Sequence, residues 1–397
     1  MGQLLSQFGN VFLEVAALWL LQLRSPAYLA AAGVVIMAPT ILAAVGGAVV
    51  DHIGPRRLMV LTDLSRMTGV ALMTLLVVLR PEATPILLLV ALGLTSLGAA
   101  FFNPSESVMV PEIVDDANLP SANGLMQSTW QSATTAGYVV GGAALAAIGT
   151  TVILGFDALT YAISAVTILL IPRPSHERAQ EASSAPPLSL EAFQEGFRGL
   201  RNLGWLLRMM PTIVILNMIL NGAFIMLPYW VHHQLGSGVV VYGVLIGSWT
   251  GGQLAGSLGA GAFRRWPVWQ VTTLTALIEG LLFLTFGFDL NPVGDAATLI
   301  VAGVANGIMN ALAMVIMQRA IPPEVRGRAF GLFTSLVTLA NPVGPLLGGL
   351  TTGFLPPWWL WLIGGLACLY FAYILARSPD LRAIRGDQAV ASEAPGV

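Results

Sequence analysis

Apolar stretches of about 20 residues recur along almost the whole chain, separated by short breaks of glycine, proline or charge. A helix needs about 20 mostly apolar residues to cross the hydrocarbon core of a bilayer. The 397 residues are 56% hydrophobic and only 10% charged, whereas soluble domains carry about 25% charged residues. A soluble core of this length could not hide so much apolar surface. The pattern therefore predicts an all-α membrane protein, since β-barrel strands would alternate over about 10 residues.

The apolar windows predict twelve transmembrane helices in two six-helix bundles. The predicted ranges are 3–23, 28–50, 58–79, 85–108, 121–147, 150–171, 209–231, 239–262, 268–288, 294–317, 328–352 and 355–376. The longest polar stretch, 172–208, separates the two halves. It has the composition of a linker, and its second half has the spacing of a surface helix. We therefore expect an N-terminal bundle at 1–171, a cytoplasmic linker at 172–208, a C-terminal bundle at 209–376 and a cytoplasmic tail at 377–397.

The two halves resemble each other at a nearly constant offset of about 207 residues. This offset maps Asn10 onto Asn217, Glu14 onto Asn221 and Gly124 onto Gly331. Parallel six-helix repeats around a central path are an architecture of transporters. The pattern therefore predicts pseudo-symmetric bundles with a path between them.

The arginines predict the orientation in the membrane. With both termini in the cytoplasm, every arginine lies on the cytoplasmic side except Arg24 and Arg80, which lie outside, and Arg66, which lies within a span. This asymmetry fits the positive-inside rule. We expect a multi-pass protein of the bacterial inner membrane.

The stretch GGAVVDHIGPRR at 46–57 then falls in a tight cytoplasmic turn between the second and third spans. It resembles the loop 2–3 signature of the major facilitator superfamily, which Gly47, Asp51, Gly54, Arg56 and Arg57 match, although histidine and proline replace two of its usual basic residues. FFNPSESVMVPEIV, GYVVGGAAL and FDALTYAISAVTILLIP resemble the branch of macrolide-efflux and enterobactin-exporter-like drug:proton antiporters. PPEVRGRAFGLFTSLVTLANPVGPLLGG resembles the helix 10–11 region of the same branch.

The resemblance implies a transporter that works by rocker-switch alternating access, with this turn as a gate that holds the outward-facing state. Within the turn, Gly47 would permit close helix approach, and Asp51 would accept hydrogen bonds from a neighbouring helix N-terminus. Arg56 and Arg57 would pair with carboxylates or lipid phosphates. We include Arg66 in this gate motif. The alternative is a plain positive-inside anchor with a tight turn.

Four acidic residues within spans are candidates for proton coupling, because ionisable groups at membrane depth are costly and often functional. Glu14 shares one helix face with Gln3, Gln7 and Asn10, so we expect this face to line the central path, where a carboxyl could bind and release a proton. Asp63 lies three residues before Arg66, which predicts an ion pair. Asp157 and Glu279 are the other two candidates. A structural role stays open for all four.

Polar and aromatic residues near the predicted path are candidates for contacts with substrate. Asn217 and Asn221 mirror Asn10 and Glu14 on the opposite wall, and helix–helix hydrogen bonding is the alternative role. Aromatic side chains suit a broad pocket for lipophilic cargo, although packing is the commoner role of each. The predicted path residues are Gln7, Asn10, Asn217, Asn221, Trp130, Tyr138, Phe224 and Tyr229.

The chain shows no pattern typical of an enzyme or a metal site. His232 and His233 are adjacent, so they do not share a helix face, and Cys368 is the single cysteine. A net charge of -2 argues against a nucleic-acid partner. We expect no metal and no cofactor beyond a proton gradient, and a monomer whose partners are small-molecule substrate, protons and membrane lipid.

These observations favour a secondary transporter that exports lipophilic or amphipathic small molecules by proton antiport. The spans lack the helix 4 arginine and the helix 5 Gly-Pro that proton-coupled drug exporters of the family often carry, so antiport is the weaker part of this interpretation. Three alternatives stay open: a dedicated exporter of a siderophore or other metabolite, a flippase for lipid or lysolipid, and a membrane receptor or assembly factor without transport activity.

Overall fold

The computed structural model describes most of the chain. The described residues are 2–115, 118–171, 204–263, 265–286, 291–320, 333–352, 354–356, 358–378 and 382. The predicted linker at 172–208 and the predicted tail at 377–397 lie mostly outside these residues.

The N-terminal half is built from helices joined by very short turns. Its elements are α1 (Gly2–Gln22), α2 (Pro26–Met37), η1 (Ala38–Leu42), α3 (Ala43–Ile53), α4 (Pro55–Leu79), η2 (Pro81–Ala83), α5 (Thr84–Ile113) and α6 (Leu119–Leu170). The predicted second span is therefore three consecutive elements. Pro39 accounts for the break, because proline lacks the N–H that would continue the α-helix. The backbone tightens there into the 3₁₀ turn η1.

Element α6 is two helices in sequence that meet at Gly149. This glycine has a φ of 75° within the otherwise helical run, a conformation that a side chain would strain. The position agrees with the break predicted between 147 and 150.

The C-terminal half repeats this construction. Its elements are α9 (Gly204–His233), α10 (Val239–Gly259), η4 (Ala260–Phe263), α11 (Val268–Phe286), α12 (Pro292–Ala320), α14 (Val343–Thr351) and α15 (Trp359–Arg377). Helix α14 is the end of a longer apolar helical stretch, Phe333–Thr351.

The described residues give twelve membrane-crossing segments, as predicted. Nine helical stretches are long and apolar enough to cross a membrane, and one of them, Ser121–Leu170, contains both helices of α6. Helix α10 supplies a further segment of 21 residues, and the run from α2 to α3 supplies the last.

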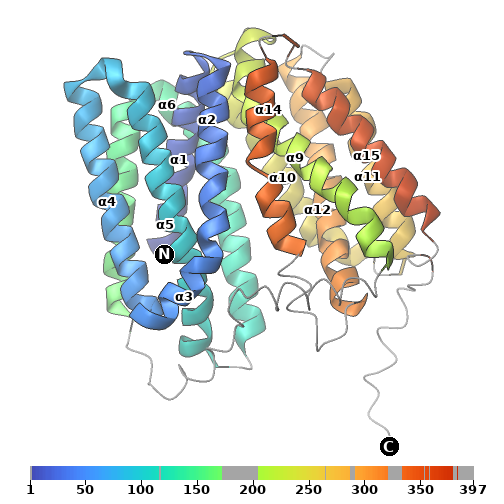
Figure 1. The fold of residues 1–397 in the computed structure, drawn as a ribbon, viewed down its shortest axis with the longest axis horizontal. Coiled ribbons are helices and arrows are strands. Elements are labelled where there is room, and N and C mark those ends of the chain that lie inside the picture. Colours follow the sequence, from blue (N-terminus) through green and yellow to red (C-terminus); the bar gives the residue numbers. More distant parts are fainter. Residues whose placement is uncertain are drawn as a thin grey trace, which may run out of the picture.

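These segments form two bundles that stand side by side (Figure 1). Helices α1 to α6 make one bundle, in which α1 and α4 both pack against α6. Helices α9 to α15 make the other, in which α10 packs on α12 and α11 packs on α15. The two bundles meet along α6 with α10 and along α2 with α14. The predicted all-α fold with two six-helix bundles is thus confirmed.

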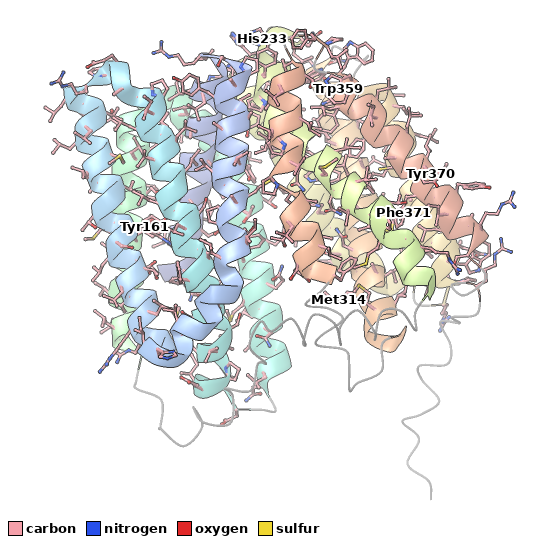
Figure 2. All side chains as sticks on the ribbon, in the orientation of Figure 1. Tyr161, His233, Met314, Trp359, Tyr370 and Phe371 are labelled. Carbon is pink, nitrogen blue, oxygen red and sulfur yellow. The ribbon has the colours of Figure 1, made fainter. Side chains whose placement is uncertain are left out.

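Aromatic side chains fill the core of the C-terminal bundle. Apolar side chains cover the outer surface of both bundles. The largest fully buried side chains include Trp230, Trp361, Phe283 and Phe286. Side chains project outward around both bundles in Figure 2, and many of the exposed large hydrophobic residues are leucines and valines. On α4, for example, Leu75 and Leu79 are 54% and 61% exposed. Lipid is the solvent that suits such a surface, so the chain is a multi-pass membrane protein.

Candidate functional site

The polar face predicted on α1 packs against α6 within the N-terminal bundle. The side-chain amide of Gln7 donates a hydrogen bond of 3.0 Å to the hydroxyl of Thr134. Asn10 accepts a hydrogen bond from the hydroxyl of Tyr161 on the second helix of α6. Gln7 and Asn10 are each only half-buried. Part of this face is therefore used for helix packing.

Glu14 continues the same face one turn further along α1. Its carboxylate accepts a hydrogen bond of 2.9 Å from the hydroxyl of Tyr138, which lies on the first helix of α6. Tyr138 is 9% exposed, whereas Glu14 is half-buried. The hydrogen-bond partner of this acid is therefore a neutral phenol and not a base.

Asp63 and Arg66 form the predicted ion pair on α4. Nη1 of Arg66 lies 3.6 Å from Oδ1 of Asp63, and both side chains are almost fully buried. The Arg66 guanidinium also lies over two aromatic rings, 5.2 Å from the centre of Phe102 and 5.4 Å from that of Tyr161. Such cation–π contacts help to compensate a desolvated charge. Arg66, assigned from the sequence to the gate motif, therefore lies in the interior of the bundle.

Asp157 of α6 joins this pair, which makes a buried cluster of two acids and one base. Asp157 is 0% exposed and interacts electrostatically with Arg66. Two glycines make room for the cluster. A Cβ on Gly9 of α1 would lie 2.5 Å from Oδ1 of Asp157, and a Cβ on Gly98 of α5 would collide with Nε of Arg66. Four helices therefore converge on one charged site.

The turn between α3 and α4 is built as the sequence pattern requires. Gly54 ends α3 with a φ of 86°, which only glycine adopts without strain. Pro55 then begins α4 at a position where its missing N–H costs nothing. Arg56 donates hydrogen bonds to the backbone carbonyls of Ile168 and Leu169 at the end of α6. A cation at a helix C-terminus is favoured by the helix dipole.

Gly47 makes no close helix contact in this arrangement of the helices, since a Cβ there would meet nothing within 4 Å. Its predicted role in the outward-facing state stays a prediction. The neighbouring Gly46 does make such a contact, because its Cβ would lie 2.5 Å from the carbonyl oxygen of Ala100 on α5. Arg57 is exposed. The side chain of Asp51 lies outside the described part of the structure, so its predicted contact stays a prediction.

Asn217 and Asn221 lie one turn apart on α9, as predicted. The amide of Asn217 donates to the backbone carbonyl of Ile213 at 2.9 Å. The amide of Asn221 donates to the side-chain oxygen of Asn341 at 3.2 Å, near the start of α14. Both asparagines are half-buried. Asn341 was not anticipated, because nothing near it in the sequence points to α9.

Glu279 of α11 is 2% exposed and belongs to a chain of amides in the C-terminal bundle. Asn306 of α12 donates to Oε1 of Glu279 at 3.1 Å. The side-chain oxygen of Asn306 accepts from Gln253 and from Asn310, each at 2.8 Å. Asn310 is exposed, so the chain leads from the surface of the helices to the buried acid. The three amide side chains of this chain were not predicted, because they lie far from Glu279 in the sequence.

The aromatic residues predicted on the path have different environments. Phe224 packs in an aromatic cluster, with ring centroids 4.8 Å from Trp249 and 5.1 Å from Trp361. Tyr229 stacks on His233 at 3.9 Å near one end of the molecule. Trp130 is 49% exposed. Phe224 therefore has an evident packing role, while about half of the Trp130 side chain is exposed.

The two bundles are in close contact at glycines on two pairs of helices, α2 with α14 and α6 with α10. A Cβ on Gly33 of α2 would collide with Pro345 of α14. On the other side of the contact, a Cβ on Gly243 of α10 would lie 2.6 Å from the carbonyl oxygen of Tyr138 on α6. Such close backbone contact between helices is typical of small residues at membrane helix interfaces.

The two adjacent histidines lie at one end of this contact. The ring of His232 packs edge-on against Trp19 of α1, with centroids 5.8 Å apart, and so joins the two bundles. His233 stacks on Tyr229 at the end of the molecule labelled in Figure 2. Within the described ranges, no group of three or more His, Cys, Asp or Glu side chains could hold a metal ion.

The model of the Major Facilitator Superfamily matches residues 1–345 of the sequence. The chain belongs to this superfamily. The superfamily match and the efflux relatives described below indicate a transporter.

Curated relatives within the superfamily include efflux proteins. The chain is 27% identical over 366 residues to the multidrug efflux pump Tap of Mycolicibacterium fortuitum, which covers 86% of this chain and 85% of that protein. It is 26% identical over 317 residues to macrolide efflux protein A of Enterococcus faecalis, and this match covers 75% of this chain and 92% of that protein. The resemblance to macrolide-efflux proteins expected from the sequence is thereby confirmed.

Solved structures of the superfamily share the fold. The nucleoside transporter NupG superposes with a TM-score of 0.68 at 14% identity, over 97% of this chain and 99% of that one. A bacterial homologue of the iron transporter ferroportin, in an inward-facing state, gives a TM-score of 0.67 at 13% identity. The superposition covers 96% of this chain and 97% of that one. At these identities the likeness extends to the fold alone.

Proposed function

We propose that this member of the superfamily exports lipophilic or amphipathic small molecules of several kinds from the bacterial cell, in exchange for protons. The relatives named as a multidrug pump and a macrolide efflux protein support export, since the matches cover most of each chain. The proposed carrier works as a monomer in the inner membrane with both termini in the cytoplasm. Its energy comes from the proton gradient.

The assignment of the coupling role to Glu14 rests on its hydrogen-bond partner, Tyr138. Asp63 and Asp157 lie beside the Arg66 guanidinium, and Glu279 is fully buried and accepts a hydrogen bond from Asn306. Glu14, in contrast, is half-buried and bonded to the phenol of Tyr138. A carboxylate without a basic partner can take up either a proton or a cationic substrate. We therefore place the exchange at Glu14, and we give the two aspartates and Glu279 supporting roles.

The contact between the bundles supports alternating access. In the orientation predicted from the arginines, Gly33, Gly243 and His232 lie in the outer half of the membrane. Contact there closes the extracellular side, which corresponds to an inward-facing carrier. Rocking of the bundles would open this contact and so expose Glu14 to the extracellular side.

Dye export from cells or vesicles, measured with unrelated competitors, tests this proposal. A multidrug-type exporter should lower dye accumulation in an energised membrane, and several chemically unrelated compounds should each inhibit it. Inhibition by a single compound class would point instead to a dedicated exporter. Ligand binding without any gradient-dependent flux would contradict transport altogether.

A further inference from the structure

Tyr242 has a buried hydroxyl for which the structure shows no partner. The residue lies on α10 of the C-terminal bundle, is 0% exposed, and its hydroxyl makes no hydrogen bond to any described residue. An unpaired buried hydroxyl lowers stability by about 1–3 kcal/mol. A tyrosine of this kind needs an explanation, since phenylalanine would fill the same space without that loss.

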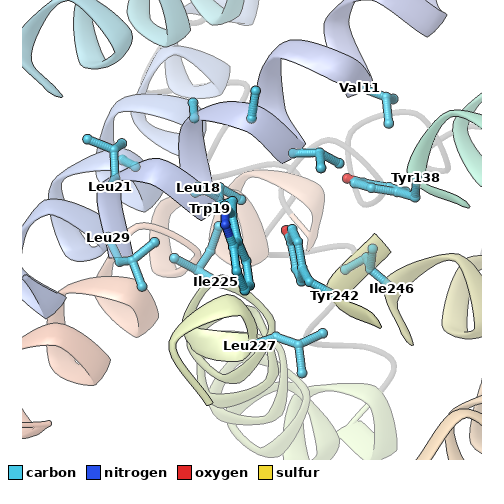
Figure 3. Packing of buried hydrophobic residues seen from close by; sticks show 14 of the residues in the cluster. Val11, Leu18, Trp19, Leu21, Leu29, Tyr138, Ile225, Leu227, Tyr242 and Ile246 are labelled. Carbon is cyan, nitrogen blue, oxygen red and sulfur yellow. The ribbon is translucent and has the colours of Figure 1, made fainter. Parts of the chain in front are cut away.

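Two ionisable groups that influence the Tyr242 phenol lie on the other bundle. The phenol of Tyr242 interacts electrostatically with Glu14 of α1 and with Tyr138 of α6. The neighbouring Gly243 packs directly on the carbonyl of Tyr138, so α6 and α10 are in backbone contact at this level. Figure 3 shows the hydroxyl oxygens of Tyr138 and Tyr242 both directed toward α1, the helix that carries Glu14.

The acceptor capacity of Glu14 fits a second tyrosine. An ionised carboxylate offers about four lone-pair sites, and Tyr138 uses one of them. Hydrogen bonds to an ionised acceptor are roughly twice as strong as neutral ones. Among the residues that the structure describes, the ionisable groups that interact with Glu14 are these two phenols, which are neutral hydrogen-bond donors. Protonation of Glu14 therefore weakens both bonds at once.

We propose that Tyr242 is a positioning residue whose hydrogen bond to Glu14, across the contact between the bundles, depends on the protonation state of Glu14. When Glu14 is ionised, a small side-chain movement brings the Tyr242 hydroxyl onto its carboxylate, and α1, α6 and α10 are tied together. When Glu14 takes up a proton or a cationic substrate, the tie is released. This inference rests on the proposed exchange at Glu14.

The tie would meet a requirement of antiport. An antiporter must not reorient while empty, because protons would then leak through it without moving substrate. In the inward-facing state the empty carrier has an ionised Glu14, which is the form that the Tyr242 bond holds in place. The loaded carrier, with Glu14 neutralised, is free to reorient.

A distance measurement on purified protein tests the tie without any substrate. Spin labels at Leu23→Cys and Gln234→Cys, in a Cys368→Ala background, report the separation of the two bundles at the end where they touch. Both positions are exposed, and they lie on different bundles. We expect the closed population to fall as the pH is lowered. Tyr242→Phe should abolish this pH dependence, and so should Glu14→Gln, with no further change when the two are combined.

Tyr370→Phe is the matched control, since Tyr370 is 58% exposed on α15, and it should keep the wild-type pH profile. A purely structural Tyr242 would behave differently: its phenylalanine variant would gain stability and keep the pH profile. A wild-type profile in Tyr242→Phe, or a flat profile in the wild type itself, would overturn the inference.

Proton leak into substrate-free proteoliposomes provides the second readout. Tyr242→Phe should leak several-fold faster than wild type, while Tyr370→Phe should not. Equal leak in all three proteins would overturn the tie. If wild-type protein exports no dye, the proposed function fails separately, because the distance series needs no substrate and still decides the role of Tyr242.

Discussion

Oδ1 of Asp63 and Nη1 of Arg66 lie 3.6 Å apart inside the N-terminal bundle. Asp157, on the neighbouring helix, interacts with the same guanidinium. One base therefore serves two buried acids from different helices. Burying charges is costly unless they are paired, so Arg66 is the residue on which the stability of this cluster depends.

Arg66→Met should destabilise the protein strongly. The change leaves Asp63 and Asp157 buried without a counter-charge, and removing one partner of a buried pair typically costs about 3–5 kcal/mol. Thermal unfolding in detergent measures the effect. Arg80→Met is the control, because Arg80 and Glu82 form an exposed pair, 74% and 71% exposed; it should unfold like the wild type. Equal unfolding temperatures for the two variants would contradict the assignment.

Gly98→Ala should damage the same cluster from the opposite helix. Its Cβ would collide with the Arg66 guanidinium, and overpacking of this kind costs about 1–3 kcal/mol. Gly155→Ala on α6 offers a matched control, since a Cβ there meets nothing within 4 Å. The unfolding temperature of the first variant should fall and that of the second should not. A tolerated Gly98→Ala would mean that Arg66 does not need this space.

Asn306→Leu should cost more stability than Glu279→Gln. The leucine leaves the buried Glu279 without its hydrogen-bond donor and the half-buried Gln253 without its acceptor, and an unsatisfied buried group costs about 1–3 kcal/mol. The glutamine keeps an oxygen that can accept from Asn306. If Glu279→Gln unfolds earlier than Asn306→Leu, the charge itself matters more than the hydrogen-bonded chain.

Gly243→Ala should weaken the contact between the bundles without unfolding either one. Its Cβ would lie 2.6 Å from the Tyr138 carbonyl across the contact, so the closed arrangement becomes strained. We expect a smaller closed population between labels at Leu23→Cys and Gln234→Cys, and a lower transport rate. Gly259→Ala, on the same helix but with no neighbour within 4 Å of its Cβ, should leave both unchanged. The same distance distribution in both variants would rule out a close contact at Gly243.

The fold was predictable because each span carries its own signal. Twenty apolar residues must be helical in lipid, where backbone groups find no water, and the break near Gly149 follows from local glycine chemistry. The ion pair of Asp63 and Arg66 was also local, since residues three apart share a helix face. The shape of the second span was missed, although Pro39 signals the break at η1.

Contacts between distant helices could not be read from the chain. Asp157 lies 91 positions after Arg66 in the sequence, and only the packing of α4 on α6 brings them together. Gly46, and not Gly47, lies in close contact with α5. Which of the two glycines makes this contact depends on the rotation of α3 about its axis, and the loop signature does not specify that rotation. Tyr242 gave no signal at all, because a tyrosine in an apolar span looks like ordinary packing until its unpaired hydroxyl is seen beside Glu14.

Proton-driven export through Glu14 is the central claim, and one transport assay tests it most directly. Uptake of a lipophilic cationic dye into inside-out vesicles is followed under an imposed pH gradient for wild type, Glu14→Gln and Glu82→Gln, whose acid is exposed outside the core. The account predicts gradient-dependent uptake in wild type and Glu82→Gln and its loss in Glu14→Gln, with all three proteins folded and present at equal amounts. Undiminished uptake in Glu14→Gln would contradict it.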